Sequence, residues 1–536
     1  MKTFPLLLLF FVACCWGCRQ TAQVSDQIGA DSIRQKKMLD AQLVAGNFSD
    51  QKAVHFDSSA IRSFVKKYPG FASYGADLEK FYRARNYSYA WYDRNGVIEQ
   101  ASALFNRIQN LQQDGIKATL PYTQNFQALM DDRDTLLRRE PMNAEAELML
   151  TSQYFSFARH VWHGIDESET RKLEWFLPRK KLDLDALMDS LLNPTSKPFV
   201  THEPVYRQYA LLKSYLKKYN DIESRGGWKT ITLDRKAYHK GDSSMVVVEL
   251  RKRLFASGDY AGDTTSTLFT DDLEAAVKIF QESRGATPDG IVGSGMVKDL
   301  NVPVAEIIQK IVVNMERCRW VPQSMDGDYM VVNIPSFKLY VYHADSLVWD
   351  MNVVAGQAIH QTNIFSGDLK YIVFSPYWNV PASILKNEVM PGIEADPDYL
   401  AKHNMEKVGN TVRQKPGPRN SLGLVKFLFP NSYSIYLHDT PSKSLFGKDN
   451  RAFSHGCVRL AEPKKLAMYL LRNNPEWTEA KIDAAMNAGK EKYVTLDKTV
   501  PVLLAYLTAF VGRDGRLNVR NDVYNLDARL AKMMLQ

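Results

Sequence analysis

The chain has 536 residues, enough for roughly three or four domains at about 150 residues each. Its 45% hydrophobic and 24% charged residues are close to the averages of globular proteins, which excludes a disordered, collagen-like or low-complexity chain. The formal net charge of +8 is small for this length, and no run of Lys and Arg with interleaved aromatic residues occurs. Nucleic acid is therefore not an expected partner. A mildly basic surface suits either a polyanionic polymer or ordinary solubility.

An export signal is the first expected element, at residues 1–18. Phe4 to Cys18 form a run of fifteen residues without charge, bounded by Lys2 and Arg19. Such a run is shorter than the roughly 20 residues that span a bilayer, and it is typical of a signal peptide. No later segment is long and apolar enough to predict a membrane helix.

The cysteines of this segment suggest how it is processed. Ala13 precedes Cys14 and Gly17 precedes Cys18, and a small residue before a cysteine resembles the processing site of a bacterial lipoprotein. The resemblance implies an exported protein of the periplasm or cell envelope, whose membrane attachment is a lipid on Cys14 or Cys18. A plain secretory signal that is cut elsewhere is the alternative.

A polar stretch at 19–50 lacks periodic apolar spacing and is typical of a linker. The segment 51–235 instead carries apolar residues at the 3.6-residue spacing of helices, so we expect a helical scaffold domain there. This spacing is clearest at Tyr209, Leu212, Leu216 and Tyr219. His160 and His163 lie three residues apart on a predicted helix, but packing is favoured over metal binding because no third ligand lies at a suitable spacing.

Residues 241–301 predict a separate module of three short helices with glycine-containing turns between them. The module resembles the three-helix peptidoglycan-binding domain found beside many cell-wall enzymes. This resemblance rests on Phe280-Gln281, Gly285, Asp289-Gly290, Gly293 and Leu300. Met296 departs from the pattern, which usually has threonine there. From the residues alone, a helical spacer without a ligand is an equal alternative.

A linking helix is expected within 302–326. After it, the spacing of the apolar residues changes from that of a helix to that of strands. Short β-branched runs with turns between them predict a mainly β domain over 327–497. The expected strands are Val331–Ile334, Lys338–Tyr342, Val348–Val354, Tyr371–Phe374 and Tyr433–Leu437. A C-terminal extension is expected from 498 to 536.

Residues 384–430 interrupt the strand pattern with five prolines, several glycines and scattered charge. A long insertion inside a sheet is usually functional, and we expect a mobile cap over the site. Its basic residues could meet the carboxylates of a ligand. They are Lys386, Lys402, Lys407, Arg413, Lys415 and Arg419. An inert surface loop is the alternative.

The segment from His438 to Arg459 carries the candidate chemistry. It contains one thiol and two imidazoles, at Cys457, His438 and His455. A cysteine is a strong nucleophile as the thiolate, and a neighbouring imidazole both takes its proton and stabilises its charge. Gly456 has no Cβ, so a substrate carbonyl can approach backbone N–H groups that form an oxyanion hole. These residue types match a covalent acyl-transfer mechanism.

Two other roles for these residues stay open on residue types alone. Cys457 could be a buried structural thiol, the commoner fate of a free cysteine. Alternatively, His438 and Cys457 could bind zinc, with His455 or Asp439 as a further ligand. Cys318 lies on the apolar face of the linking helix and is expected to be a buried thiol.

The motif resembles the signature of the L,D-transpeptidase catalytic domain (YkuD type). In this signature a histidine is followed, after fifteen residues, by Ser-His-Gly-Cys, as His438 is here by Ser454-His455-Gly456-Cys457. Further similarity to the large, multidomain (YcbB-like) members lies in Tyr377-Trp378-Asn379-Val380-Pro381, Pro416-Gly417-Pro418, Lys426-Phe427 and Tyr436-Leu437-His438-Asp439-Thr440-Pro441. Arg459 stands where the commonest pattern has asparagine and where larger members have arginine.

This resemblance implies a multidomain α+β protein with a helical scaffold domain, a peptidoglycan-binding-like domain and a mainly β catalytic domain with a capping insertion. It also implies that the protein forms 3-3 cross-links in peptidoglycan. Cys457 would attack the carbonyl between the third residue of a tetrapeptide donor stem and its terminal D-Ala, forming a thioester and releasing D-Ala. His438 would be the base, first for the thiol and then for the acceptor amine.

The resemblance also implies supporting roles around these two residues. The backbone carbonyl of Asp439 would orient the His438 ring. The backbone N–H groups of Gly456 and Cys457 would hold the oxyanion, and His455 would help to position the substrate. Substrate contact is further expected from Tyr436, Ser454 and Arg459.

The implied partners are the donor and acceptor stem peptides of peptidoglycan, and carbapenem β-lactams as inhibitors that acylate Cys457. No metal or organic cofactor is expected. The same acyl-enzyme could instead pass to water, to a free D-amino acid or to a lysine of a lipoprotein, and the sequence does not choose the acceptor. A wall-binding protein without activity is a further alternative, against which the intact His438, His455, Gly456 and Cys457 argue.

Overall fold

The structure is a computed structural model that describes residues 54–93, 96–132, 143–192, 203–322, 325–344 and 346–534. The expected signal peptide at 1–18, with Cys14 and Cys18, and the expected linker at 19–50 lie outside the described residues. Among the described helices, none has the length and apolar character needed to cross a membrane. Contacts divide the chain into two compact units. Unit 1 comprises Met1–Asn110, Thr119–Arg159 and Leu182–Pro204, and unit 2 comprises Leu111–Ala118, His160–Lys181 and Val205–Gln536.

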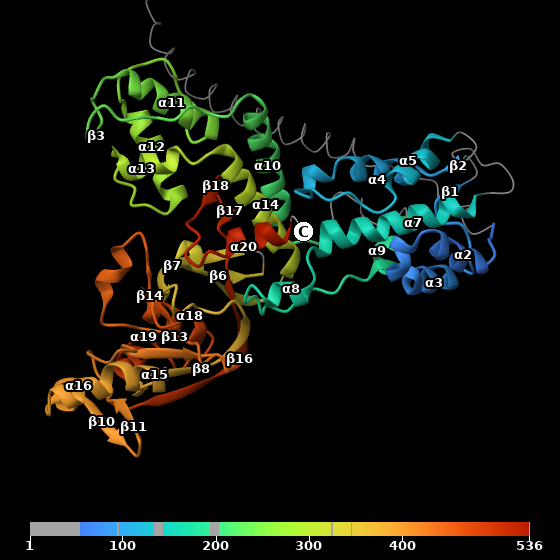
Figure 1. Cartoon of the computed structure of the whole chain (residues 1–536). Helices are drawn as coiled ribbons and strands as arrows, with labels where there is room; N and C mark the ends of the chain where they lie inside the picture. Colours follow the sequence, from blue (N-terminus) through green and yellow to red (C-terminus); the bar gives the residue numbers. More distant parts are fainter. Residues whose placement is uncertain are drawn as a thin grey trace, which may run out of the picture. The chain divides into compact units, whose positions relative to one another are not determined.

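Unit 1 is mainly helical, as the periodicity predicts (Figure 1, blue to cyan). Its elements are α2 (Ser59–Lys67), η1 (Pro69–Tyr74), α3 (Gly75–Ala84), β1 (Tyr92–Asp93), β2 (Gly96–Val97), α4 (Glu99–Gln109), α5 (Thr123–Asp131), α7 (Ala144–Ala158) and α9 (Leu184–Leu192). Helix α7 is the centre of the unit, because every residue from Ala146 to Ala158 is buried. Asn143 caps it by accepting hydrogen bonds from the N–H groups of Glu145 and Ala146, at 3.0 and 3.1 Å.

Contacts assign the last part of the helical region 51–235 to unit 2. Helix α10 (Gln208–Ser224), inside that range, packs along α14 (Val304–Trp320) within unit 2. Buried polar groups fix this packing. Arg319 of α14 donates a hydrogen bond to the carbonyl of Asp114 at 2.7 Å, and α10 donates to the carboxylate of the same residue. Such contacts between distant segments leave no periodic signal in the sequence.

The expected three-helix module is confirmed. It consists of α11 (Met245–Ser257), α12 (Asp271–Arg284) and α13 (Ser294–Leu300), with β3 (Ala237–Tyr238) paired to β4 (Val292–Gly293). Leu254, Phe280 and Leu300 are fully buried in its one core. Gly258 and Gly285 end α11 and α12 with φ of +86° and +79°, the left-handed conformation that favours glycine at a helix C-terminus.

The mainly β domain is built on a nine-stranded sheet (Figure 1, yellow to red). Across the sheet the strands are β14 (Ala452–Ser454), β7 (Ser346–Gly356), β15 (Val458–Leu460), β13 (Leu437–His438), β12 (Val425–Leu428), β8 (Ser366–Phe374), β16 (Lys492–Ala505), β5 (Asp328–Asn333) and β6 (Lys338–His343). β6 also pairs with β7, so the pairing closes on itself. Helices α18 (Pro463–Leu471) and α19 (Glu479–Met486) add Leu466 and Ile482 to the core.

Shorter elements complete unit 2. They are η2 (Leu111–Asp114), η3 (Arg159–His163, which follows α7), α8 (Glu167–Arg171), η4 (Ile334–Ser336), η6 (Lys443–Gly447), β17 (Ala509–Val511), β18 (Leu517–Val519) and α20 (Leu526–Met533). The strands β17 and β18 form a hairpin.

The sheet continues beyond the domain boundary expected at 497. β16 runs to Ala505 and pairs with β8 on one side and with β5 on the other. Its register with β8 shifts between Thr495 and Val500. The residues at this shift are not paired with β8, and the strand resumes after them.

The strand expected at Tyr433–Leu437 shortens to Leu437–His438. Asn431 explains the difference, because its side-chain oxygen accepts hydrogen bonds from the N–H groups of Tyr433 and Ile435, at 3.0 and 3.2 Å. A side chain that binds nearby backbone competes with strand pairing and produces a turn instead.

The insertion is a folded subdomain rather than an irregular loop. It contains β9 (Trp378–Asn379), α15 (Ala382–Ile384), η5 (Leu385–Val389), α16 (Met390–Ala395), α17 (Tyr399–Lys402), β10 (Met405–Val408) and β11 (Thr411–Gln414), with strand order β10-β11-β9. Val380, Val389, Met405 and Val412 are buried in its own small core. Its bounds also differ from 384–430, because β9 precedes that range and β12, inside it, belongs to the main sheet.

Candidate active site

The candidate site lies where β13 pairs in parallel with β15. Leu437 is opposite Val458, and His438 is opposite Arg459. Residues that pair across two strands point to the same face of the sheet, and successive residues alternate between faces. Leu437 and Val458 are fully buried in the core of the sheet. His438 and Arg459 therefore point to the other face.

Tyr436 and Cys457 extend this face, because each lies two residues before His438 or Arg459 in its own segment. The N–H of Val458 donates to the carbonyl of Tyr436 at 3.1 Å, which continues the pairing in this direction. The rings of Tyr436 and His438 meet edge to face, with centroids 5.7 Å apart. The fold thus brings together four of the side chains that the sequence predicts for the site, those of Tyr436, His438, Cys457 and Arg459.

Cys457 is half-buried, and its Sγ lies 3.7 Å from the backbone carbonyl of Ser434. Burial raises the pKa of the thiol above its ordinary value, although hydrogen bonding to Tyr436 and the charge of Arg459 partly oppose this shift. Within the described part of the chain, no hydrogen bond joins Sγ of Cys457 to the imidazole of His438. At neutral pH the resting thiol is therefore protonated.

His438 is buried and held in one orientation. Its Nδ1 lies 2.5 Å from the backbone carbonyl of Asp439, the contact that the resemblance implies. Because a carbonyl only accepts, Nδ1 carries the hydrogen and Nε2 keeps a lone pair. Burial, followed by the charge of Arg459, lowers the pKa of His438 to about 4. The ring is therefore a neutral base at neutral pH.

Arg459 supplies the positive charge of the site. It is half-buried, and burial lowers its pKa while the neighbouring Cys457 raises it. Its charge lowers the pKa of both Cys457 and His438. Arg459 therefore favours a thiolate over a thiol and disfavours an imidazolium ion.

The loop that carries Cys457, the candidate nucleophile, is a tight turn held by hydrogen bonds within it. Gly456 has φ of +111°, a conformation that strains any residue with a side chain. Ser454 Oγ donates to the carbonyl of Cys457 at 2.5 Å and accepts from the N–H of Gly456 at 3.2 Å. The buried Ser454 hydroxyl thus supports the loop. The substrate contact expected of Ser454 stays a prediction.

This bracing changes which amide can stabilise an oxyanion. Of the two amides expected in that role, the N–H of Gly456 donates to Ser454 Oγ. For the N–H of Cys457, no acceptor occurs within the described part of the chain. The N–H of Cys457 is therefore the free hydrogen-bond donor beside Sγ.

Two residues that sequence reasoning missed hold this loop from behind. Thr362 Oγ1 donates to the carbonyl of Gly456 at 2.7 Å and accepts from the N–H of Gly356 at 2.9 Å. The hydroxyl of Tyr524 accepts from the N–H of Thr362 at 3.1 Å and donates to the carbonyl of Gly356 at 2.8 Å. Thr362 and Tyr524 are both buried. Only the fold reveals them, since Tyr524 belongs to the segment expected to lie outside the catalytic domain.

The insertion reaches the nucleophile loop through Glu388 of η5. Glu388 Oε1 lies 3.2 Å from Nε2 of His455, whose ring centroid is 4.9 Å from that of His360. Both members of the Glu388–His455 pair are partly exposed, so the pair adds little stability. It does place the insertion beside the loop that carries Cys457.

The positive charge of the insertion is partly neutralised within it. Lys402 pairs with Asp396 at 2.7 Å, and Arg413 and Lys415 pair with Glu406 at 2.6 and 3.4 Å. The other three basic residues form no ion pair with any described residue. They are Lys386, Lys407 and Arg419.

The structure also bears on the zinc alternative and on the state of Cys318 and Cys457. Among the described residues, no three His, Cys, Asp or Glu side chains are grouped as metal ligands would be. Cys318 is fully buried on α14, and burial raises its pKa to about 12, as expected for a structural thiol. Cys318 and Cys457 are both free thiols.

Comparison with known protein families agrees with this geometry. Residues 327–482 match the family model of the L,D-transpeptidase catalytic domain. Residues 76–216 match a scaffold domain, and residues 244–300 match a domain described as "Putative peptidoglycan binding domain". The chain is therefore a multidomain α+β protein in which residues 327–482 match the L,D-transpeptidase catalytic domain of the YkuD type and residues 244–300 match a peptidoglycan-binding-type module.

A Haemophilus influenzae protein named "Putative L,D-transpeptidase" is 32% identical to this chain over 247 residues, which are 42% of this chain and 50% of that protein. The match thus spans about half the length of this curated relative. Solved L,D-transpeptidases from Xylanimonas cellulosilytica and Stackebrandtia nassauensis are each 14% identical and cover 51% of this chain. The alignments cover 100% and 97% of those two chains, with TM-scores of 0.18 and 0.22, values too low to support an argument.

The neutral state of the Cys457–His438 pair makes a prediction about thiol reactivity. Because the pKa of the thiol is raised and that of the imidazole is lowered to about 4, alkylation of Cys457 by iodoacetamide should accelerate as the pH rises through 7 to beyond 9. The rate is measured by mass spectrometry of the peptide that contains Cys457. An Arg459→Gln variant should shift this rise to still higher pH. A rate that levels off below pH 7, as a thiolate–imidazolium pair would give, would contradict this picture.

The contact from Thr362 to the nucleophile loop predicts a positioning effect. Thr362→Val keeps the shape but removes the hydrogen bonds to Gly456 and Gly356, so acylation of Cys457 by a carbapenem should slow by about 10-fold or more. Thr362→Ser, which keeps the hydroxyl, should restore most of the rate. If the loop were held without Thr362, the two variants would acylate at equal rates. Stopped-flow spectroscopy gives the rate constant separately from the affinity.

Proposed function

We propose that this chain is an L,D-transpeptidase that forms 3-3 cross-links between the stem peptides of peptidoglycan. The observation that carries the proposal is the parallel pairing of β13 with β15, which sets Cys457, His438 and Arg459 on one face inside a domain of the L,D-transpeptidase family. In the reaction, Cys457 attacks the carbonyl that joins the third residue of a tetrapeptide donor stem to its terminal D-Ala. A thioester forms, and D-Ala leaves.

Proton transfer starts from two neutral groups. The thiol proton passes from Cys457 to Nε2 of His438 as the sulfur attacks, because Nδ1 is bound to the carbonyl of Asp439. The low pKa of the ring favours quick release of the proton to the departing amine of D-Ala. In this scheme a small approach of Sγ and the ring accompanies substrate binding.

Charge on the tetrahedral intermediate needs donors in fixed positions. The N–H of Cys457 and the positive charge of Arg459 are the groups that would stabilise it. In the second half of the reaction, the amine of an acceptor stem loses a proton to His438 and attacks the thioester carbonyl. The products are the cross-linked dimer and the free thiol, so no metal or organic cofactor takes part.

The insertion acts as the cap of this reaction. The contact of Glu388 with His455 supports this role, because it brings the insertion beside the thioester position. Lys386, Lys407 and Arg419 are available to bind carboxylates of the stem. A cap that limits water at the thioester favours attack by an amine over hydrolysis.

Other outcomes of the same acyl-enzyme form the second candidate function. Transfer to water, to a free D-amino acid or to a lipoprotein lysine would use Cys457 and His438 in the same way. The folded insertion beside the loop favours transfer to an amine over transfer to water. Carbapenems should acylate Cys457, because the strained lactam carbonyl mimics the scissile amide. The proposed location is the periplasm or cell envelope, with a lipid anchor on Cys14 or Cys18.

Cys457 should be required for every product. With purified disaccharide tetrapeptides, the wild-type chain should release D-Ala and yield a 3-3 linked dimer, whereas Cys457→Ser should lose at least about 10³-fold in rate because the serine hydroxyl is a far weaker nucleophile here. Cys318→Ala is the matched control, since this thiol is buried on α14 and should be dispensable. The products are measured by mass spectrometry of the muropeptides. Dimer formation by Cys457→Ser at the wild-type rate would exclude the proposed nucleophile.

The cap should control how the acyl-enzyme is resolved. Glu388→Ala removes the contact with His455, so the ratio of cross-linked dimer to hydrolysed tripeptide should fall by about two- to fivefold, the effect expected of a partly exposed pair. Glu394→Ala, an exposed carboxylate on α16 without an ion pair to any described residue, is the control and should leave the ratio unchanged. An unchanged ratio in Glu388→Ala as well would count against the capping role.

A further inference from the structure

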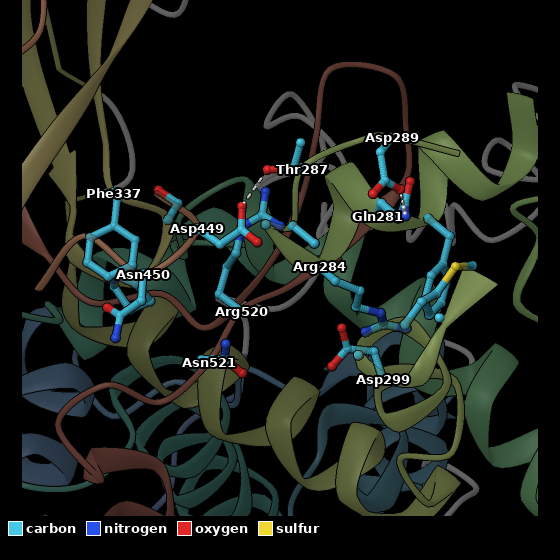
Figure 2. A pocket seen from close by; sticks show the side chains of 18 of the residues that line it. Gln281, Arg284, Thr287, Asp289, Asp299, Phe337, Asp449, Asn450, Arg520 and Asn521 are labelled. Carbon is cyan, nitrogen blue, oxygen red and sulfur yellow. Dashed lines mark hydrogen bonds between the residues drawn. The ribbon is translucent and has the colours of Figure 1, made fainter. Parts of the chain in front are cut away.

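Side-chain hydrogen bonds join the three-helix module to the catalytic domain beside a cavity of about 460 Å³ (Figure 2). Thr287 Oγ1 of the module donates to Asp449 Oδ1 at 2.7 Å, as the dashed line in Figure 2 marks. Arg520 Nη1 donates to the backbone carbonyl of Glu282 on α12, also at 2.7 Å. The residues that line the cavity include none of the candidate catalytic or substrate-binding residues. These contacts are therefore separate from the reacting groups.

Arg520 binds the C-terminal end of α12. Glu282 lies in the last turn of this helix, where the negative end of the helix dipole favours a cation. Gly285 ends the helix, and a Cβ there would approach the Arg520 side chain to 3.2 Å, so glycine allows the close contact. The Arg520 backbone is also held, because its N–H donates to the carbonyl of Thr508 and its carbonyl accepts from Lys310 Nζ, both at 2.7 Å. Arg520 thus joins the helix end to a fixed stretch of backbone.

Four residues after Arg520, Tyr524 reaches the back of the loop Ser454–Cys457, the nucleophile loop. The Tyr524 hydroxyl accepts from the N–H of Thr362 at 3.1 Å. Thr362 Oγ1 in turn donates to the carbonyl of Gly456 at 2.7 Å. A continuous series of contacts therefore leads from α12 through Arg520, Tyr524 and Thr362 to the residue before Cys457.

The chain between Arg520 and Tyr524 is held along its length. The Asp522 carboxylate accepts from the hydroxyl of Tyr506 at 2.6 Å and from the N–H of Asp527 at 2.8 Å. The Tyr506 hydroxyl accepts from the N–H of Tyr524 at 2.8 Å, and the rings of these two tyrosines stack with centroids 5.4 Å apart. A segment held in this way passes a displacement of Arg520 on to Tyr524 instead of absorbing it.

The contact of Thr287 leads to the other side of the same loop. Its partner Asp449 lies five residues before Ser454, which ends β14, and β14 pairs with β7. Ser454 Oγ donates to the carbonyl of Cys457 at 2.5 Å. The module is therefore connected both to Gly456, through Thr362, and to Cys457, through Ser454.

We infer that the three-helix module holds the nucleophile loop in its reactive position, with Arg520 as the positioning residue that joins them. The inference rests on the function proposed for Cys457 and adds a role that does not require the module to bind a ligand. Coupling between distant groups is carried by packed and hydrogen-bonded contacts, and substitutions along them change it several-fold. Acylation is sensitive to such changes because a reacting atom displaced by about 1 Å reacts far more slowly.

The test measures acylation of Cys457 in the full chain by a carbapenem, a small acylating agent. Arg520→Gln removes the contact with Glu282 and should slow acylation about fivefold, with an unchanged affinity of the initial non-covalent complex. Arg520→Lys keeps a cation at the helix end and should retain most of the rate. Arg516→Gln is the control, because this arginine pairs with Asp514 and does not line the cavity. Equal rates in Arg520→Gln and the wild type would overturn the role of Arg520.

A second substitution separates positioning from a loss of stability. In a Thr362→Val background the path from Arg520 to Gly456 is already broken, so Arg520→Gln should then slow acylation by less than about 1.5-fold. A substitution that only destabilises the protein would cost the same factor in both backgrounds. That result would overturn the path through Thr362.

Thr287→Val tests the module at an exposed position, where the fold does not depend on the side chain. Loss of the bond to Asp449 should slow acylation about twofold, and it should do so in the Thr362→Val background as well, because this path runs through Ser454. Thr265→Val is the matched control, since its hydroxyl binds Asp263 inside the module.

The outcomes separate this role from the proposed function. Equal rates in Thr287→Val and Thr265→Val would overturn the second path, and this comparison decides the role of the module if Arg520→Gln does not fold. Absence of an acyl adduct on Cys457 of the wild type, with a carbapenem and with a tetrapeptide alike, would overturn the proposed function and this inference with it. Acylation of the wild type at the rate of every module variant would overturn the inference alone.

Discussion

The site depends on one constraint, the register of the parallel pair β13–β15. Because His438 is opposite Arg459, the apolar Leu437 and Val458 pack in the core, and the candidate catalytic side chains share the other face of the sheet. A shift of one residue would bury the charged side chains and expose the apolar ones. The core therefore fixes the register, and the register in turn fixes which residues can react with one substrate.

The closed sheet gives this pair its rigid support. β13 lies between β15 and β12, and the ring of strands closes through the pairing of β6 with β7. It includes β16, which continues past the boundary expected from the sequence. Beyond β16, Tyr524 returns to bind Gly356 and Thr362 behind the nucleophile loop. The C-terminal stretch is thus part of the catalytic domain in physical terms, because it supplies both a central strand and the hydrogen bonds that hold the loop.

The electrostatics of the site follow from its burial. A buried imidazole next to Arg459 stays neutral, and a half-buried thiol stays protonated, so the site holds its reactive groups in uncharged form until substrate arrives. Such a site needs a donor for the charge that appears during reaction, and the free N–H of Cys457 fits this need better than the engaged N–H of Gly456. Ser454 contributes by holding the turn, a role that its residue type does not reveal.

Much of this architecture could be predicted from local patterns. Short β-branched runs predicted four strands of the sheet, β5 to β8, and helical spacing predicted the three-helix module. The spacing from His438 to Cys457 predicted the candidate pair.

What the sequence could not show depends on contacts between distant segments. α10 packs on α14, and Thr362 meets Tyr524, without any periodic signal. The sequence does not predict that the insertion has a core of its own, because this small core is assembled from residues scattered between Val380 and Val412.

The claim that Cys457 is an acylated nucleophile is tested most directly by intact-mass spectrometry of the wild-type chain, quenched in acid within seconds of mixing with a tetrapeptide donor. The account predicts a mass increase equal to the tripeptide acyl group, located on Cys457 by peptide mapping and accompanied by an equal amount of D-Ala. Release of D-Ala without any adduct on Cys457, or an adduct on a different residue, would contradict it.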